Sequence, residues 1–79
     1  MRVDVLKLNG PVFQGEASEV LARTETGDIT ILDHHEPLIT ILRPGKLSVI
    51  DLTGVKKDFE AMAGFVEVRH DNSVHILLD

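Results

Sequence analysis

Turn-forming residues recur along this chain at intervals that leave no room for a long helix. Glycine and proline interrupt regular structure most strongly, and asparagine, aspartate and serine favour turns through side-chain hydrogen bonds to the backbone. Such residues stand at Asn9-Gly10-Pro11, Gly15, Thr26-Gly27-Asp28, Asp33–Pro37, Pro44-Gly45, Thr53-Gly54, Gly64 and Asp71-Asn72-Ser73. The segments between these places have the length of β-strands.

Apolar residues alternate with polar ones between the turns, which is the period of a strand with one buried face. The pattern is clearest at Val74, Ile76 and Leu78, at Ile39 and Ile41, and at Leu47 and Val49. Two hairpins are predicted, Lys46–Asp51 with Val55–Met62 and Phe65–His70 with Ser73–Leu78. We therefore expect an all-β fold, a small antiparallel β-sandwich of two facing sheets.

One segment does not fit this pattern clearly. Residues Glu16–Arg23 are rich in good helix formers and contain neither glycine nor proline. A helix of two turns is only marginally stable without tertiary support. We therefore predict a strand here.

The overall size and charge limit the classes of function. A chain of 79 residues forms a single domain, residues 1–79, with one core. Its net charge of −5 and the lack of a basic stripe argue against nucleic acid or anionic lipid as a partner. Cysteine is absent, which excludes disulfides and thiolate metal sites. No apolar run approaches the roughly 20 residues that span a bilayer, so membrane insertion is not expected.

The only dense group of potential metal ligands or general bases is Asp33-His34-His35-Glu36. Adjacent histidines on an extended backbone point to opposite sides, so a polar turn before Pro37 explains the group better. Asp51-Leu52-Thr53-Gly54 weakly resembles the Asp-Thr-Gly of aspartic proteases, but Leu52 interrupts that triplet. No nucleophile elbow or phosphate-binding loop is present. We expect no catalytic residue, no metal, no cofactor and no bound nucleotide.

A biotinyl or lipoyl carrier domain is the alternative class, together with a generic β-sandwich binding module. Carrier domains are β-rich and present a modified lysine at a hairpin tip, in biotinyl domains next to methionine. Here Ala63 follows Met62, and the nearest lysines, Lys56 and Lys57, lie on the other side of Phe59.

Five short motifs occur in an order that resembles a known family. They are Phe13-Gln14-Gly15-Glu16, Gly27-Asp28, His35-Glu36-Pro37-Leu38, Leu42-Arg43-Pro44-Gly45 and Gly64-Phe65-Val66-Glu67-Val68. In this order they resemble the N-terminal β-sandwich domain of the epsilon subunit of rotary F-type ATP synthases. The resemblance covers nearly the whole chain, and it also places an antiparallel strand at Glu16–Arg23.

The resemblance implies a mechanical role and two protein partners. Family members bind the gamma subunit and rest on the polar loops of the membrane-embedded c ring, as peripheral subunits on the cytoplasmic face of the membrane. Gly27 and Asp28 match the loop that carries an acid against the c ring, and His35, Pro37 and Leu38 match a turn near the same lower surface. Turn geometry and core packing are the alternative roles of Pro37 and Leu38.

The chain also departs from the family pattern. Thr30 stands where the family usually has glycine, Asp33-His34 replaces Pro-Gly, and Glu36 replaces alanine. We expect a more charged and less flexible turn. The sequence ends at Asp79, without the C-terminal helical hairpin of the family, so neither the inhibition of ATP hydrolysis nor the nucleotide site found on that hairpin is expected from these residues.

Overall fold

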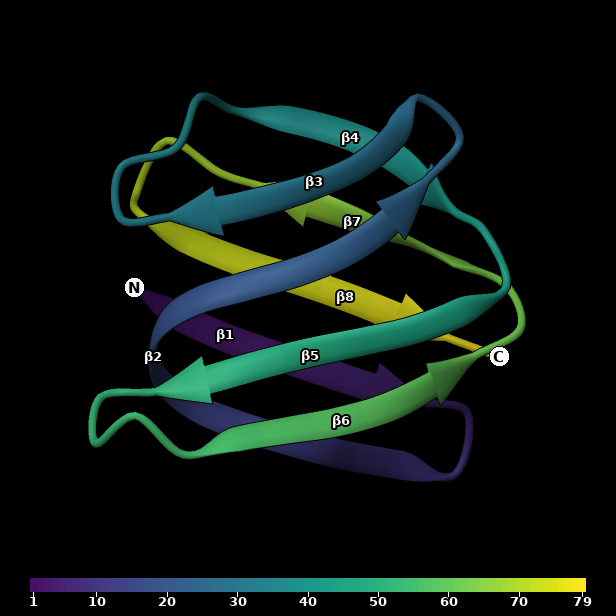
Figure 1. The fold of residues 1–79 in the computed structure, drawn as a ribbon, viewed down its shortest axis with the longest axis horizontal. Coiled ribbons are helices and arrows are strands. Elements are labelled where there is room, and N and C mark those ends of the chain that lie inside the picture. Colours follow the sequence, from purple (N-terminus) through teal and green to yellow (C-terminus); the bar gives the residue numbers. More distant parts are fainter.

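Eight strands and no helix make up the structure, a computed structural model that describes all residues 1–79 (Figure 1). The strands are β1 (Arg2–Lys7), β2 (Gly10–Thr24), β3 (Gly27–Leu32), β4 (Leu38–Leu42), β5 (Gly45–Asp51), β6 (Lys56–Ala61), β7 (Gly64–Val68) and β8 (Ser73–Leu78). The all-β prediction is confirmed. No segment has the length and helical apolar character of a membrane-crossing helix.

Two layers enclose the core, but they belong to one continuous sheet rather than to two separate sheets. The strand order is β1-β8-β7-β4-β2-β5-β6, and β3 adds to β2. The strand that joins the layers is β2, whose 15 residues pair with β1 at their beginning and with β3 and β5 at their end. The predicted sandwich is therefore correct in its layers, while its two sheets remain hydrogen-bonded to each other.

One strand pair is parallel, contrary to the purely antiparallel prediction. Strand β1 lies beside β8 with Val3 opposite Val74 and Val5 opposite Ile76. Hairpin turns impose antiparallel pairing only on consecutive strands. Because β1 and β8 are the first and last strands, no turn fixes their relative direction, and the sequence carries no signal for it.

The prediction of a strand at Glu16–Arg23 is confirmed, since these residues lie within β2. A β-bulge interrupts the alternation of buried and exposed residues in this segment. Ala17 is buried, and the next buried residues are Val20 and Ala22, so the alternation skips one position where the pairing with β5 shifts between Ala17 and Glu19. At the skipped position Ser18 Oγ donates to the carbonyl oxygens of Ile50 and Asp51, at 3.2 and 3.3 Å.

Aliphatic side chains from both layers form a single core of 16 buried residues. The largest of those that are completely enclosed include Ile31, Leu47 and Ile76. Phe13, Ile29, Leu38 and Phe59 pack against this core from its margin. The two layers are thus held together by side chains from every part of the sequence.

Both predicted hairpins are present, although β7 ends at Val68, two residues earlier than expected. The β5–β6 turn is organised by one carboxylate. Asp51 Oδ1 accepts hydrogen bonds from the backbone N–H of Thr53 at 2.9 Å, from Thr53 Oγ1 at 2.6 Å and from the N–H of Val55 at 3.0 Å. Asp51 and Thr53 therefore build the hairpin turn that the sequence indicates.

Acid is expected to weaken this turn. Hydrogen bonds from the Thr53 side chain and from the backbone of Val55 lower the pKa of Asp51 below its ordinary value of 3.8. A lowered pKa in the folded state contributes stability that is complete above about pH 4 and is lost as the pH falls through the lowered pKa. The Asp51→Asn variant should therefore lose less stability than the parent between pH 5 and pH 2, as measured by urea unfolding at each pH. An equal loss in both proteins would contradict this assignment.

Candidate functional site

The predicted site residues Gly27 and Asp28 begin β3, directly after the tight turn that connects it to β2. A buried threonine holds this turn. Thr24 Oγ1 donates to the carbonyl oxygen of Gly27 at 2.7 Å and accepts from the N–H of Thr26 at 3.2 Å. Gly27 has a φ of +118°, a value that glycine adopts readily and other residues rarely do. The turn thus presents Asp28 to solvent from a fixed backbone.

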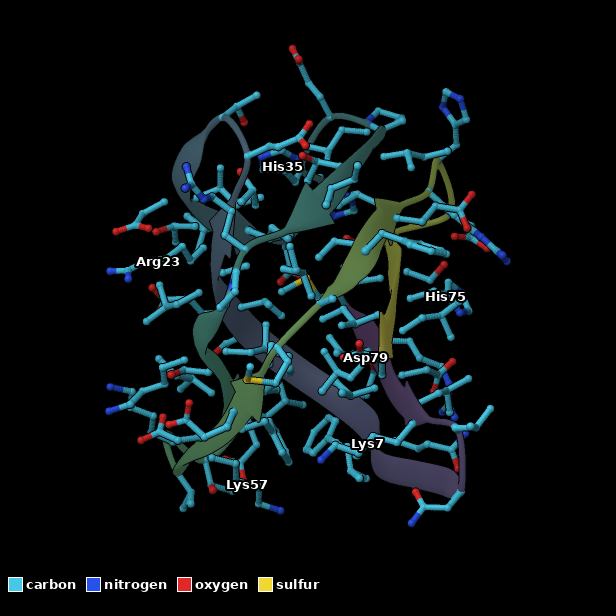
Figure 2. The ribbon with its side chains drawn as sticks, turned by 90° about the vertical axis from the view of Figure 1, so that its right-hand side faces the viewer. Lys7, Arg23, His35, Lys57, His75 and Asp79 are labelled. Carbon is cyan, nitrogen blue, oxygen red and sulfur yellow. The ribbon has the colours of Figure 1, made fainter.

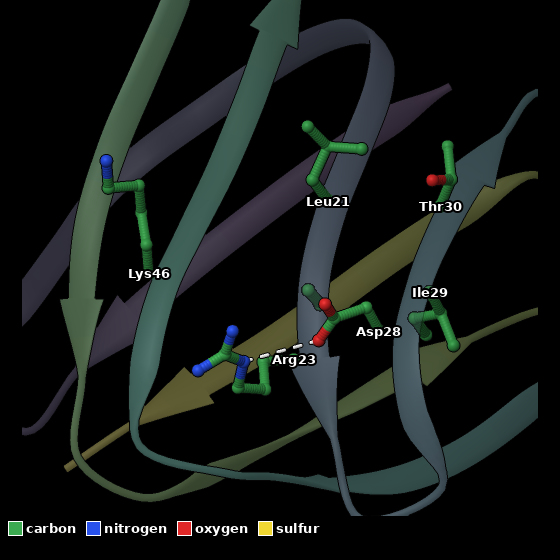
Figure 3. A pocket seen from close by; sticks show the side chains of 7 residues that line it. Leu21, Arg23, Asp28, Ile29, Thr30 and Lys46 are labelled. Carbon is green, nitrogen blue, oxygen red and sulfur yellow. Dashed lines mark hydrogen bonds and ion pairs between the residues drawn. The ribbon is translucent and has the colours of Figure 1, made fainter.

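Asp28 forms an ion pair with the residue opposite it on β2. Arg23 Nε lies 3.3 Å from Asp28 Oδ1, and both side chains are more than half exposed. Figure 3 shows the two side chains reaching toward each other, with Leu21 and Thr30 farther along the same strands and Lys46 on the neighbouring β5. These residues line a shallow hollow on the outer surface of the sheet.

A second hollow lies beside the first, at the end of the β2–β3 hairpin. It is lined by Arg23, Gly27, Asp28, Arg43 and Pro44. None of these residues has a large apolar side chain. The backbone N–H of Arg43 donates to the carbonyl oxygen of Arg23 at 2.9 Å. The guanidinium of Arg43 itself makes no ion pair or hydrogen bond within the chain. The candidate site therefore contains one acid and two arginines.

The β3–β4 loop holds the residues that depart from the family pattern. His34 has a φ of +62°, so it adopts the left-handed conformation for which glycine is the favoured residue. Its N–H donates to Asn72 Oδ1 at 2.7 Å, and Asn72 Nδ2 lies 3.3 Å from Asp33 Oδ1. Asp33 Oδ1 also lies 2.6 Å from the amino group of Met1. These contacts tie the loop to the β7–β8 turn and to the start of β1, which is a structural role for both residues.

The remaining predicted site residues lie in or after this loop, at the other end of β3. His35 is half-buried, its N–H donates to the carbonyl oxygen of Leu32, and its Nδ1 lies 2.8 Å from the carbonyl oxygen of Glu36. Pro37 is exposed, and Leu38 packs against the margin of the core. In Figure 1, β3 runs between the β2–β3 turn and the β3–β4 loop, so its two ends separate the two groups. The two groups of predicted site residues therefore lie at opposite ends of β3.

The metal-site and carrier-lysine interpretations can be compared with the positions of the histidines and lysines in the structure. No three side chains among histidine, aspartate and glutamate gather in a group that could hold a metal ion. Lys56 and Lys57 belong to β6 rather than to a hairpin tip, and Lys57 Nζ lies 5.3 Å from the centre of the Phe13 ring. This arrangement gives no support to the carrier-domain alternative.

A row of apolar side chains crosses the outer surface of the other layer. Ile41 on β4 lies opposite Phe65 on β7, Phe65 lies opposite Leu77 on β8, and Leu77 lies opposite Leu6 on β1. Ile41, Phe65 and Leu77 are 52%, 47% and 42% exposed. We call Ile41, Phe65, Leu77 and Leu6 the apolar row. Next to it, Phe65, Leu77, Leu6 and Leu8 line a groove of about 510 Å³.

Most of the apolar row lies away from the hollows around Asp28, but Ile41, at the β4 end of the row, lies beside the end of β2, where the N–H of Glu25 donates to the Ile41 carbonyl oxygen at 3.0 Å. His75 shares the outer face of β8 with Leu77, since the two residues are two positions apart on a strand. Figure 2 shows His75 at one side of the molecule and Arg23 at the other. The chain thus offers two separate surfaces of different chemistry.

Sequence reasoning did not predict the apolar row, Thr24 or the arginines. A signal for the row was available, because Leu38-Ile39-Thr40-Ile41-Leu42 is apolar at both odd and even positions. Such a strand buries one face in the core and exposes apolar side chains on the other. Arg23 gave no comparable signal, because its pairing with Asp28 depends on the register of β2 with β3.

Comparison with known families identifies the domain. The family model for the β-sandwich domain of the ATP synthase delta/epsilon chain matches residues 1–79. An ATP synthase epsilon chain of Xanthomonas oryzae pv. oryzae is 40% identical over all 79 residues of this chain, which spans 56% of that relative. An epsilon chain of Xylella fastidiosa is 38% identical over 69 residues, which are 87% of this chain and 49% of the relative. The chain therefore spans about half the length of these relatives.

Solved structures agree with the assignment of the fold. A chain in the Euglena gracilis mitochondrial ATP synthase, in a structure of OSCP, F1 and the c ring, superposes with a TM-score of 0.90 at 25% identity. The match covers 96% of this chain and 48% of that one. A chain from the central stalk and c ring of the Tetrahymena thermophila enzyme superposes with a TM-score of 0.83 at 23% identity, covering 99% of this chain and 62% of its own length.

Proposed function

Because the chain belongs to the ATP synthase delta/epsilon family as its β-sandwich domain, we propose that it is a non-catalytic coupling element of the central stalk. In this role it binds the gamma subunit and the c ring, and it links ion translocation to ATP synthesis and hydrolysis. It is a peripheral subunit on the cytoplasmic face of the membrane. The match of the family model to the whole chain is the observation that carries this proposal.

The two surfaces suit two partners. A polar loop of the c ring that supplies a basic residue would meet Asp28, which is exposed at the hairpin end and held by the buried Thr24. The exposed edge of β3 continues this surface toward His35 and Pro37 at its other end. Charge-assisted hydrogen bonds of this kind are roughly twice as strong as neutral ones, and they fix orientation as well as affinity.

The apolar row suits the gamma subunit. Protein interfaces commonly combine an apolar centre with a polar rim. Here polar pairs lie beside the apolar row, with His75 Nδ1 3.6 Å from Asp4 Oδ2 and Arg69 Nε 3.1 Å from Glu67 Oε1. This distribution supports a stable contact of the apolar row with the gamma subunit.

Binding assays test the proposal directly. The chain should bind purified gamma subunit and purified c ring, and it should bind each in the absence of the other. The Asp28→Lys variant should bind the c ring at least about tenfold more weakly, because like charges that face each other across an interface are strongly unfavourable. Its binding to the gamma subunit should be unchanged.

The fold should tolerate this charge reversal. Asp28 is exposed, and substitutions of exposed residues typically change the free energy of unfolding by about 0.5 kcal/mol or less. The Asp28→Asn variant, which removes the charge and keeps the shape, should have an intermediate affinity for the c ring. Urea unfolding of the three proteins is the control. If Asp28→Lys fails to fold, the claim that Asp28 serves ring binding rather than stability is refuted. If the parent chain binds neither partner, the proposed function is refuted.

A further inference from the structure

The acid that would meet the c ring is surrounded by positive charge. Arg23 lies 3.3 Å from Asp28, and Arg43 lines the same hollow without any partner inside the chain. Lys46 lines the adjoining hollow, where its ammonium group lies 3.8 Å from Asp58. Arg23 and Arg43 together outnumber the single carboxylate of Asp28, although the chain as a whole has a net charge of −5. The hollow is thus positive on balance in an acidic protein.

Backbone contacts hold the two arginines in place. The N–H of Arg43 donates to the carbonyl oxygen of Arg23 at 2.9 Å, which brings the start of the β4–β5 connection onto the end of β2. The Arg23 side chain passes over Gly45, where a Cβ would lie 3.3 Å from Arg23 Cδ. Gly45 has a φ of +150°, so glycine is suited to this position in conformation as well as in size. The positions of the arginines therefore follow from the fold of the chain.

This arrangement fits a lone basic partner poorly. A single cation from the ring would compete with Arg23 for Asp28 and would be repelled by the unpaired Arg43. A partner that presents a carboxylate beside its cation meets no such conflict, because the cation reaches Asp28 while the carboxylate accepts from the arginines. Guanidinium groups match carboxylates in geometry and form paired hydrogen bonds with them.

We infer that the c-ring loop facing this hollow carries an acidic side chain next to its basic one, and that Arg23 and Arg43 bind the acidic one. The inference rests on the proposed contact with the c ring. If the inference holds, Arg23 and Arg43, together with Asp28, determine which c-ring loop sequences bind to this hollow.

The Arg23→Ala and Arg43→Ala variants separate the two kinds of partner. If the loop carries an acid, each variant should bind purified c ring about three- to fivefold more weakly at moderate salt, which is the size expected for one exposed charge pair. If the loop carries only a base, both variants should bind more tightly than the parent chain, because competition and repulsion are removed. Lys56→Ala, which removes a cation at the far end of the β5–β6 hairpin, should leave the affinity unchanged.

A charge exchange provides the second test. Arg43→Glu should weaken c-ring binding more than Arg43→Ala, and a ring whose loop acid is replaced by lysine should restore it. Unchanged or tighter binding in both alanine variants, together with no restoration of Arg43→Glu binding by a lysine placed in the ring loop, would overturn the inference while leaving the contact with the ring intact. Absence of c-ring binding by the parent chain would instead overturn the proposed ring contact, and the inference with it.

Discussion

Replacing Gly64 by alanine is expected to destabilise the domain more than any other single-methyl change. A Cβ at Gly64 would lie 1.9 Å from the carbonyl oxygen of Leu77 on the adjacent β8, and the φ of +147° is unfavourable for alanine. Backbone strain contributes about 1–3 kcal/mol and the overlap about 1–3 kcal/mol more, so the loss is about 2–6 kcal/mol. A domain of this size has a total stability of about 4–12 kcal/mol. Urea unfolding monitored by circular dichroism measures the loss.

Gly10 provides a matched control for this prediction. Its φ of +131° is close to that of Gly64, but no heavy atom lies within 4 Å of the position that a Cβ would take. The Gly10→Ala variant should therefore suffer the conformational strain alone, about 1–3 kcal/mol. The difference between the two variants measures the clash with Leu77. Equal destabilisation by both substitutions would show that β7 and β8 move apart easily and would refute the prediction.

Gly64 also illustrates how far the sequence determines the fold. The glycine was recognisable as a turn residue and as the first residue of a motif, but the reason that only glycine fits is its contact with Leu77, 13 positions later. The hairpin turn at Asp51–Val55 could be predicted because its hydrogen bonds join neighbours in the sequence. Local signals therefore located most strands and turns correctly.

Features that depend on distant contacts could not be predicted in this way. The parallel pairing of β1 with β8 joins the two ends of the chain, and the network of Asp33, His34 and Asn72 joins two loops. His34 has a left-handed backbone conformation, with a φ of +62°, and its N–H donates to Oδ1 of Asn72, a residue 38 positions later. The loop is charged, as the sequence indicates, and the contacts of Asp33 and His34 with Asn72 hold it in place.

Only the local part of the candidate site could be predicted, because its other contacts depend on how distant strands pair. Gly27 and Asp28 form a local turn and were found from their motif, whereas the pairing of Asp28 with Arg23 requires the register between β2 and β3. The apolar row requires the register of four strands. A surface built from several strands becomes visible only once their order is known, even when each strand is predicted correctly.

Introducing a charge into the apolar row should abolish the binding of the gamma subunit. In the Ile41→Glu variant a carboxylate would have to be buried without a partner inside the proposed interface, where Phe65 lies directly opposite. Changes at interface hot spots cost about 2 kcal/mol or more, and an unpaired buried charge belongs to this class, so the affinity for the gamma subunit should fall at least about thirtyfold. Ile41 is 52% exposed in the isolated domain, and the variant should lose only about 1 kcal/mol of stability. Binding is measured by titration with purified gamma subunit.

Two further variants separate the loss of the interface from a general effect of charge. Leu52→Glu places the same charge on an apolar residue that is 67% exposed in the β5–β6 turn, away from the apolar row, and it should bind the gamma subunit like the parent chain. Ile41→Thr keeps a β-branched side chain suited to a strand and introduces no charge, so it should weaken binding by about tenfold. Leu52→Glu should bind the c ring normally, and the two Ile41 variants should lose much more affinity for the gamma subunit than for the c ring, because Ile41 lies near the hollow around Asp28 but does not line it. Unimpaired binding of the gamma subunit by Ile41→Glu would place that contact elsewhere on the molecule.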